Sequence, residues 1–218
     1  MVLAAGASSR FGSPKLLAPL RGRPVLQHTL DAVASAGLGD VVVVLGADAP
    51  AVEATIAWRG ERRVRNGRPG DGLASSLRVG LDAAAVEVPG AAEVPGPEAA
   101  LVVLGDQPAV RPEVIRAVLD AAASPGSAGA LFVRPRYPED PAPNPVLVRR
   151  DAWPLAAALR GDRGLGPLLA ARPELVAEVP VEGANPDVDT PEDLAALAAG
   201  RPGGRGRSAG SAAARDRT

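Results

Sequence analysis

A lysine and an arginine occupy a loop rich in glycine and serine near the start of the sequence. The loop, LAAGASSRFGSPK at residues 3–15, contains Arg10 and ends on Lys15, the single lysine beside 23 arginines. An ammonium is a compact, strongly hydrated point charge, whereas a guanidinium is a planar fork. In a chain that uses arginine almost everywhere else, a retained lysine indicates that this position needs an ammonium.

The same loop has the features of a phosphate-binding turn. Gly6 follows the first expected strand and leaves the backbone open, so the amides of Ala7, Ser8 and Ser9 can point into one concavity. Consecutive N–H groups of this kind attract anions, above all phosphates. The glycine spacing matches neither G-x-G-x-x-G nor G-x-x-x-x-G-K-[ST]. On these residues alone, an ordinary connection between a strand and a helix is an equal alternative.

Two carboxylates stand at the edges of other expected elements. Asp106, in VVLGDQP, follows an apolar run, where a carboxylate is either a helix cap or a ligand of Mg²⁺, which prefers a few carboxylates together with phosphate oxygens and water. In NPDVDTPEDL, Thr190 and Pro191 are typical of a helix start. Asp189 precedes that cap and has no evident structural task.

Further polar residues lie in loops beside expected helices. GDGLASSLRVGL, at residues 70–81, enters a helix with Ser75 and Ser76, which are either helix caps or ligand contacts. In NPVLVRR, Asn144 can donate and accept hydrogen bonds but carries no charge. In LRGDRGLGPLL, Arg163 lies on a loop flanked by glycines, where a phosphate contact and a solvated turn are equally good interpretations.

Strands and helices alternate along the chain and would position these motifs. The expected strands are residues 1–4, 41–46, 100–106, 129–133 and 145–150, and the expected helices are residues 24–36, 49–58, 73–85, 112–123, 151–159 and 164–171. Nearly all-apolar strands predict a Rossmann-like three-layer α/β/α fold with a mostly parallel central sheet. Ligands of such sheets bind beyond the carboxyl ends of the strands, where the motifs fall.

The length of 218 residues predicts one domain, for which we expect residues 1–199. Residues 200–218 are rich in arginine and glycine and are expected to form a disordered tail, while residues 86–98 are expected to be a surface connection. Because Met1 falls inside the first expected strand, we also expect the natural chain to begin a few residues upstream.

Composition excludes several classes of site and partner. There is no cysteine, so disulfides and zinc–thiolate sites are impossible, and the single histidine, His28, is expected to pack on a helix. A net charge of −1 and five aromatic residues argue against a nucleic-acid partner. No apolar run is long enough to span a membrane, so we expect a cytoplasmic protein without a membrane partner.

Taken together, the motifs resemble those of a known family. The run LAAGASSRFGSPK resembles the signature L-A-[AG]-G-x-S-x-R-[MF]-G-x-x-K of the nucleotidyltransferases that mature the molybdenum cofactor. The motifs of residues 70–81, 102–108, 144–150, 159–169 and 185–194 follow in that family's order, so the resemblance covers residues 2–198. The form LAAG is that of the cytidylyltransferase branch.

The resemblance implies a role for each motif. It implies nucleotide contacts from Leu3, Ala4, Ala5, Gly6, Ala7, Ser8, Ser9, Asn66, Gly70, Ser75 and Ser76, and catalytic contacts from Lys15 and Arg10. It makes Asp106 and Asp189 the ligands of Mg²⁺. Asp187, on the same side of an extended stretch, is the alternative to Asp189. Asn144 and Arg163 would face the acceptor, although the family usually has a histidine at the position of Asn144.

The resemblance also implies a reaction: Mg²⁺-dependent transfer of CMP from CTP to molybdopterin that carries molybdenum, with release of pyrophosphate. A molybdenum hydroxylase or its maturation chaperone would be a partner. Three alternatives stay open at this point. They are a guanylyl- or sugar-phosphate nucleotidyltransferase of the same fold, a non-enzymatic carrier of the cofactor, and an oxidoreductase, a label that some relatives carry.

Overall fold

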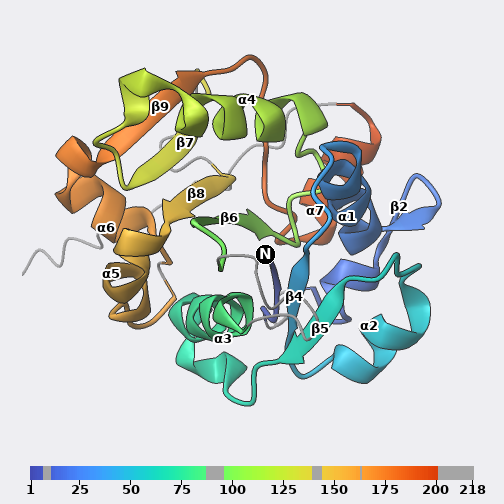
Figure 1. Ribbon diagram of the computed structural model, residues 1–218. Coiled ribbons are helices and arrows are strands. Elements are labelled where there is room, and N and C mark those ends of the chain that lie inside the picture. Colours follow the sequence, from blue (N-terminus) through green and yellow to red (C-terminus); the bar gives the residue numbers. More distant parts are fainter. Residues whose placement is uncertain (7–10, 87–95, 139–143, 163, 201–218) are drawn as a thin grey trace, which may run out of the picture.

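A twisted central sheet runs through the molecule, with helices on both of its faces (Figure 1). The computed structural model describes residues 1–6, 11–86, 96–138, 144–162 and 164–200. Within these ranges the sheet has seven strands in the order β5-β4-β1-β6-β8-β7-β9. The strands are β1 (Val2–Ala4), β4 (Val42–Leu45), β5 (Arg62–Arg65), β6 (Ala99–Leu104), β7 (Phe132–Arg136), β8 (Val146–Arg149) and β9 (Val176–Pro180).

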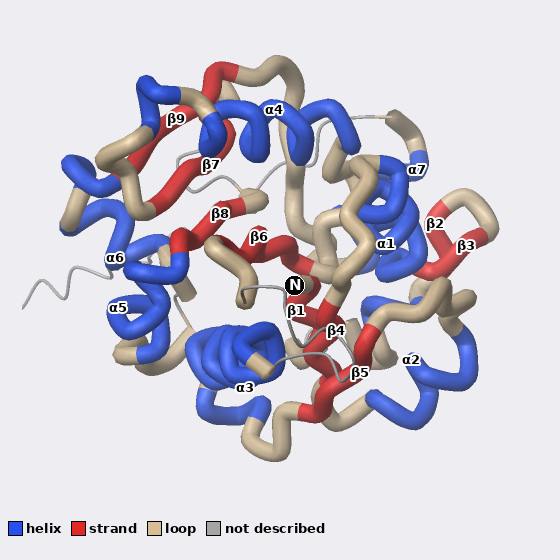
Figure 2. Tube along the Cα trace, in the orientation of Figure 1, coloured by secondary structure: helices blue, strands red, loops and turns tan. Residues whose placement is uncertain are grey.

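Only β8 breaks the parallel arrangement of the described strands. It pairs antiparallel with both β6 and β7, whereas the pairs β5–β4, β4–β1, β1–β6 and β7–β9 are all parallel. The expected mostly parallel α/β sheet is therefore confirmed. A separate hairpin, β2 (Pro19–Leu20) with β3 (Arg23–Pro24), was not predicted and lies beside the first helix (Figure 2).

The helices follow the strands in sequence, as the alternating pattern predicts. They are α1 (Val25–Ser35), α2 (Ala49–Thr55), α3 (Leu73–Ala85), α4 (Pro112–Ala123), α5 (Trp153–Ala157), α6 (Gly166–Ala171) and α7 (Pro191–Ala198), with short 3₁₀ turns at η1 (Lys15–Leu17), η2 (Pro69–Asp71), η3 (Pro125–Ser127), η4 (Arg150–Ala152) and η5 (Pro173–Leu175). None of the described helices is long and apolar enough to cross a membrane.

Alternate residues of β1, together with the residue after it, serve two separate cores. Val2 and Ala4 pack into the core beneath α1, α2 and α4, whereas Leu3 and Ala5 pack into the core beneath α3, α5 and α6. Successive side chains of a strand point to opposite faces, so an apolar strand can serve both layers. Each fully buried Val or Leu contributes about 1.5–3 kcal/mol of transfer free energy.

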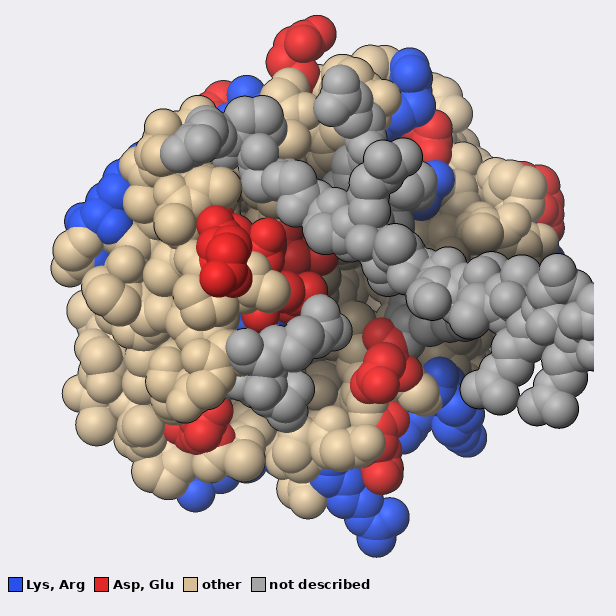
Figure 3. Space-filling view, turned by 180° about the vertical axis from the view of Figure 1, so that it is seen from behind, with Lys and Arg blue, Asp and Glu red and all other residues tan. Residues whose placement is uncertain are grey.

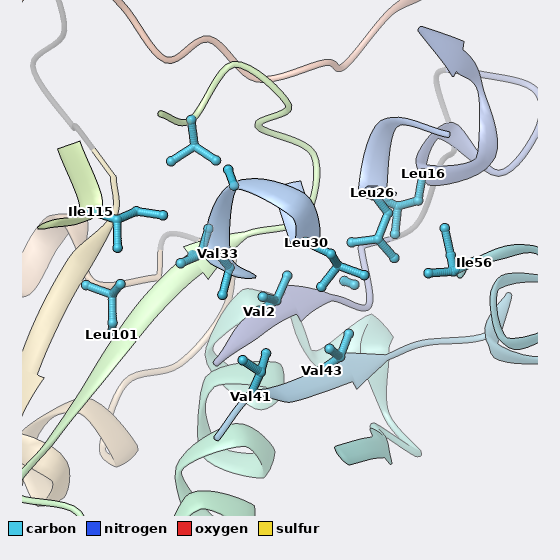
Figure 4. Packing of buried hydrophobic residues seen from close by; sticks show 14 of the residues in the cluster. Val2, Leu16, Leu26, Leu30, Val33, Val41, Val43, Ile56, Leu101 and Ile115 are labelled. Atoms are coloured by element: carbon cyan, nitrogen blue, oxygen red, sulfur yellow. The ribbon is translucent and has the colours of Figure 1, made fainter. Parts of the chain in front are cut away.

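Figure 4 shows the first of these cores. Leu26, Leu30 and Val33 of α1 lie over Val2 and Val43 of the sheet. All five side chains are at most 3% exposed. The apolar face of α1 is therefore fixed against the centre of the sheet, and the β2–β3 hairpin joins this helix to the loop that carries the candidate phosphate-binding residues.

His28 is half-buried on α1, and its Nε2 donates a hydrogen bond to the carbonyl of Leu20, 2.8 Å away. The histidine therefore ties α1 to the β2–β3 hairpin, in keeping with the packing role expected for it. The expected connection at residues 86–98 falls mostly outside the described residues, and the expected tail does so from residue 201 onward.

Candidate active site

The ammonium of Lys15 joins two carboxylates that are far away in sequence. Its Nζ donates to Oδ2 of Asp106 at 2.6 Å and to Oδ1 of Asp189 at 2.9 Å. The lysine residue is 8% exposed, whereas the carboxylates of Asp106 and Asp189 are partly accessible. The structure thus brings together the lysine and both carboxylates that the sequence pointed to.

The site lies at the edge of the sheet where the parallel strands end. Lys15 begins η1 in the connection after β1, Asp106 follows β6, and Asp189 precedes α7. In the view from behind, Asp and Glu side chains gather near the middle of the face (Figure 3). An α/β sheet of this kind accepts ligands at the edge where its parallel strands end.

Burial and the two carboxylates act in opposite directions on the pKa of Lys15. Burial has the largest single influence and lowers this pKa. The charge of Asp106, the hydrogen bonds to both carboxylates and the charge of Asp189 together outweigh burial, so the pKa of Lys15 lies above its ordinary value. The side chain is therefore a full cation at neutral pH.

Asp189 is held in place by the cap of α7. Oδ2 of Asp193 accepts hydrogen bonds from the backbone N–H groups of Asp189 and Thr190, at 3.1 and 2.9 Å. The hydroxyl oxygen of Thr190 accepts in return from the N–H of Asp193, which completes a capping box. One residue before Asp189, the N–H of Val188 donates to the carbonyl of Asp106 at 2.9 Å. The backbones that carry the two carboxylates are therefore bonded to each other.

A small apolar cluster fixes the lysine segment against the same helix. Leu20 and Val25, on either side of the β2–β3 turn, are buried with Val188, and Leu194 and Leu197 of α7 pack against them. The hairpin that follows Lys15 is thus joined to the segment that carries Asp189. Because the hairpin was not predicted, sequence alone did not indicate how these two segments meet.

Asp187, the alternative to Asp189, bonds to a different partner. Its Oδ1 accepts a hydrogen bond of 2.7 Å from Nε2 of Gln107, the residue after Asp106. Asp189 is the carboxylate that shares Lys15 with Asp106. This arrangement favours the pair Asp106 and Asp189 as metal ligands.

The donor set suits a metal that completes its coordination from the substrate. No three His, Asp or Glu side chains converge on a metal position within the ranges that the structure describes. Two carboxylates that already share one ammonium can share another cation, and Mg²⁺ takes its remaining ligands from phosphate and water. These residues therefore fit a divalent ion that arrives with a nucleotide.

Asn66, Ser75 and Ser76 form a buried polar cluster where β5 ends and α3 begins. Nδ2 of Asn66 donates to the hydroxyl oxygens of Ser75 at 2.7 Å and Ser76 at 3.0 Å. All three residues are buried. The structure thus brings together three of the expected nucleotide contacts, and their hydrogen bonds hold these side chains to one another.

A close backbone approach supports this cluster. Gly72, before α3, has a φ of +88°, and a Cβ there would lie 2.4 Å from the carbonyl carbon of Gly161. The N–H of Ala74 donates to the carbonyl of Gly161 at 3.1 Å. Two of the motifs found in the sequence are therefore in backbone contact. Gly70, in η2, is exposed.

The expected contacts in the first loop are described only in part. Leu3, Ala4 and Ala5 bury their side chains in the two cores, so a nucleotide would meet them through the main chain. Gly6 is exposed. The expected contacts Ala7, Ser8, Ser9, Arg10 and Arg163 lie outside the described residues.

Sequence reasoning missed a chain of amide hydrogen bonds beside the carboxylates. Oε1 of Gln107 accepts from Nδ2 of Asn185 at 3.0 Å, and the same Nδ2 donates to the carbonyl of Asn144 at 3.2 Å. Gln107 and Asn185 are each 2% exposed. The amide chain connects the expected acceptor residue Asn144 to Asp187 through three segments. Both amides lie within quoted motifs, but no local spacing signals their pairing.

Similarity to known proteins extends over most of the chain. Nicotine blue oxidoreductase of Paenarthrobacter nicotinovorans is 31% identical over 202 residues, covering 89% of this chain and 93% of that protein. Bifunctional protein GlmU of Sinorhizobium fredii is 38% identical over 112 residues, but these span 50% of this chain and 23% of that protein.

Solved structures agree with this similarity. The structure of Rv0371c from Mycobacterium tuberculosis H37Rv has a TM-score of 0.74 and 34% identity, covering 91% of this chain and 95% of that chain. A complex of Rv0371c with manganese has a TM-score of 0.73 and 32% identity. A nucleotidyl transferase from Methanothermobacter thermautotrophicus has a TM-score of 0.73 and 27% identity, covering 91% and 94%.

A family model, that of the MobA-like NTP transferase domain, matches residues 1–177. This range contains β1, the loop that ends at Lys15, the cluster of Asn66, Ser75 and Ser76 (the Asn66 cluster), and Asp106. Since the match spans well over half of the sequence, the chain belongs to the family of MobA-like NTP transferase domains.

Proposed function

We propose that the chain transfers CMP from CTP to the terminal phosphate of a molybdopterin that carries molybdenum, and that it releases pyrophosphate. The observation that carries this proposal is the Lys15 ammonium shared by Asp106 and Asp189 at the ligand-binding edge of the sheet. A molybdenum hydroxylase or its maturation chaperone would receive the product.

In the proposed reaction a phosphate oxygen of the acceptor attacks the α-phosphorus of CTP in line. The bond from the α-phosphorus to the bridging oxygen breaks, and pyrophosphate leaves with that oxygen. The acceptor phosphate is already anionic near neutral pH, so the chain needs no strong general base. Its task is to position two anions and to offset their repulsion.

Asp106 and Asp189 would hold Mg²⁺, which supplies positive charge to the phosphates when it is bound. The manganese complex of Rv0371c supports a divalent ion in this role. Lys15 would contact the phosphates and stabilise the charge that moves onto the leaving pyrophosphate. The Asn66 cluster would lie against the nucleoside. The buried hydroxyl groups of Ser75 and Ser76, at the start of α3, would hold the side chain of Asn66 in position.

CTP is proposed over other nucleotides because the first loop has the form LAAG. A pyrophosphate-release assay tests this choice when CTP, GTP, UTP and ATP are each supplied with Mg²⁺ and with the molybdenum-bearing cofactor, with a sugar phosphate, or with no acceptor. Release that requires both CTP and the cofactor supports the proposal. Release with GTP or with a sugar phosphate would assign another nucleotidyl transfer, and no release with any pair would favour a cofactor carrier.

The relative that covers nearly the whole chain favours a second candidate, an oxidoreductase. Nicotine blue oxidoreductase is similar over 89% of the chain. A reduced nicotinamide cofactor would then bind, although the first loop lacks the fingerprint G-x-G-x-x-G. Fluorescence titration with NADH and NADPH separates the candidates, because only the oxidoreductase should bind either cofactor at micromolar concentration.

A further inference from the structure

Lys15 bridges the two carboxylates from a position between them. One Nζ atom is within hydrogen-bond distance of Oδ2 of Asp106 and Oδ1 of Asp189. The two oxygens can therefore be no farther apart than these two bonds laid end to end. Two carboxylates at this separation suit one small cation, and the ammonium provides that cation in the structure.

We infer that Lys15 and a divalent metal ion compete for Asp106 and Asp189, so that metal binding displaces the ammonium from between the carboxylates. This inference rests on the proposed function, because that function makes the two carboxylates the metal ligands. It adds that Lys15 has two successive partners: the carboxylates before the substrate binds and the nucleotide phosphates afterwards.

Charge and geometry support the competition. A metal ion held by both carboxylates uses oxygen lone pairs at about 2.0–2.1 Å for Mg²⁺, and Lys15 now donates to one oxygen of each carboxylate. An ammonium that stayed in place would stand beside a doubly charged ion, and like charges at that range repel strongly where water is scarce. Lys15 is only 8% exposed.

The nucleotide gives the displaced ammonium a new partner. A buried ammonium that loses its carboxylates without gaining another anion is costly, so metal binding without nucleotide is opposed. Phosphate oxygens remove that cost. Metal and nucleotide should therefore strengthen each other's binding through Lys15, and the effect must be reciprocal because it is a coupling between two binding equilibria.

Manganese binding to the full chain without nucleotide tests the competition, with free Mn²⁺ measured by electron paramagnetic resonance. In Lys15→Met the ammonium is gone, and we expect the affinity for Mn²⁺ to rise by about tenfold or more, within the usual range of coupling between sites. Lys15→Arg keeps a cation that can bind carboxylates with two donors, and there the affinity should fall below that of the wild type.

A matched control removes a cation from an ion pair elsewhere. Arg134 pairs with Glu178 at 2.6 Å between the neighbouring strands β7 and β9, and Arg136 remains beside Glu178 when Arg134 is replaced. Arg134→Met should leave Mn²⁺ affinity unchanged. An equal or lower affinity in Lys15→Met would overturn the inference. If Lys15→Met does not fold, an affinity for Mn²⁺ in Lys15→Arg equal to or above that of the wild type overturns it instead.

A second readout follows the coupling to nucleotide. Adding CTP should raise Mn²⁺ affinity more in the wild type than it does in Lys15→Met, beyond the binding of Mn²⁺ by free CTP measured without protein. Equal increases in the two proteins contradict the inference. Asp189→Asn separates this failure from that of the proposed function: if this variant binds Mn²⁺ as the wild type does, the metal site itself is wrongly assigned.

Discussion

Lys15 and Asp106 are separated by 91 residues in sequence, and their side chains meet at 2.6 Å. The lysine follows β1 and the aspartate follows β6, two strands that are parallel neighbours in the sheet. Parallel pairing brings the carboxyl ends of both strands to the same edge. The contact is therefore a direct product of the fold, and it places a buried cation where phosphates are expected.

Removing the ammonium should slow the chemical step. We expect Lys15→Ala to lower the rate of pyrophosphate release in single turnover by about 10²-fold or more, the usual effect of losing one preorganised contact to developing charge. The measurement uses saturating CTP and acceptor, so weaker binding is not mistaken for slower chemistry. Unchanged turnover would remove the first loop from the active site.

The two aspartates before α7 should differ in their effect on the metal requirement. Asp189→Asn is expected to raise the Mg²⁺ concentration for half-maximal activity by about tenfold or more. Loss of a residue that only supports a metal ligand typically lowers metal affinity by about 10–100-fold, and loss of a direct carboxylate ligand should lower it at least as much. Asp187→Asn should change it less, because the amide oxygen can still accept from Gln107. Equal shifts, or a larger shift in Asp187→Asn, would contradict the ligand assignment.

Gly72 should tolerate no side chain. Its positive φ and the 2.4 Å approach of Gly161 lead us to expect that Gly72→Ala lowers the free energy of unfolding by about 1–3 kcal/mol. Gly70→Ala is the matched control, because a Cβ there has nothing within 4 Å, and its effect should stay within about 0.5 kcal/mol. Urea unfolding followed by circular dichroism measures both. Similar losses in the two variants would contradict this explanation.

Acid should weaken the fold partly through Asp31. Burial alone raises the pKa of this carboxyl, but hydrogen bonds from Arg59 and Gln27 and the charges of Arg59 and Arg23 outweigh it, so its pKa lies below the ordinary 3.8. A carboxyl with a depressed folded-state pKa stabilises the fold above its unfolded-state pKa, and this contribution is lost as pH falls through the folded value.

Asp31→Asn tests this contribution. The free energy of unfolding of the variant, measured between pH 6 and 2.5 in urea, should depend less on pH below about 4, where the unfolded carboxyl binds protons first. Above that pH the variant should be less stable than the wild type by a constant amount. A variant whose curve runs parallel to that of the wild type through the acid range would show that Asp31 carries none of the pH dependence.

The sequence predicted the elements whose pattern is local. The structure places α3 at Leu73–Ala85 and α4 at Pro112–Ala123, with the bounds expected from their apolar spacing. The strand β5 was missed because its sequence is RRVR, which lacks an apolar run. It is a strand because its arginines bond outward, Arg62 to Asp40 and Arg65 to Glu53, while its backbone pairs with β4.

The site was predicted as separate motifs, and its geometry was not. Asp106 and Asp189 could each be placed at the end of a strand or the start of a helix, because the residues next to them in the sequence indicate where these elements end and begin. The contact of Lys15 with both carboxylates depends on strand order and on the β2–β3 hairpin, neither of which local spacing specifies. The pairing of Gln107 with Asn185 spans 78 residues and has no periodic signal at all.

The reversed direction of β8 inverts the usual rule for finding functional residues in a parallel sheet. Val146, at the start of β8, is paired with Val102, near the end of β6. The residues before β8 therefore lie at the edge where its neighbours finish, and the turn after β8 lies at the opposite edge. If Asn144 faces the acceptor as proposed, substitutions that change substrate selectivity should therefore lie on the amino side of β8, whereas the other described strands of the sheet present their carboxyl ends to that edge.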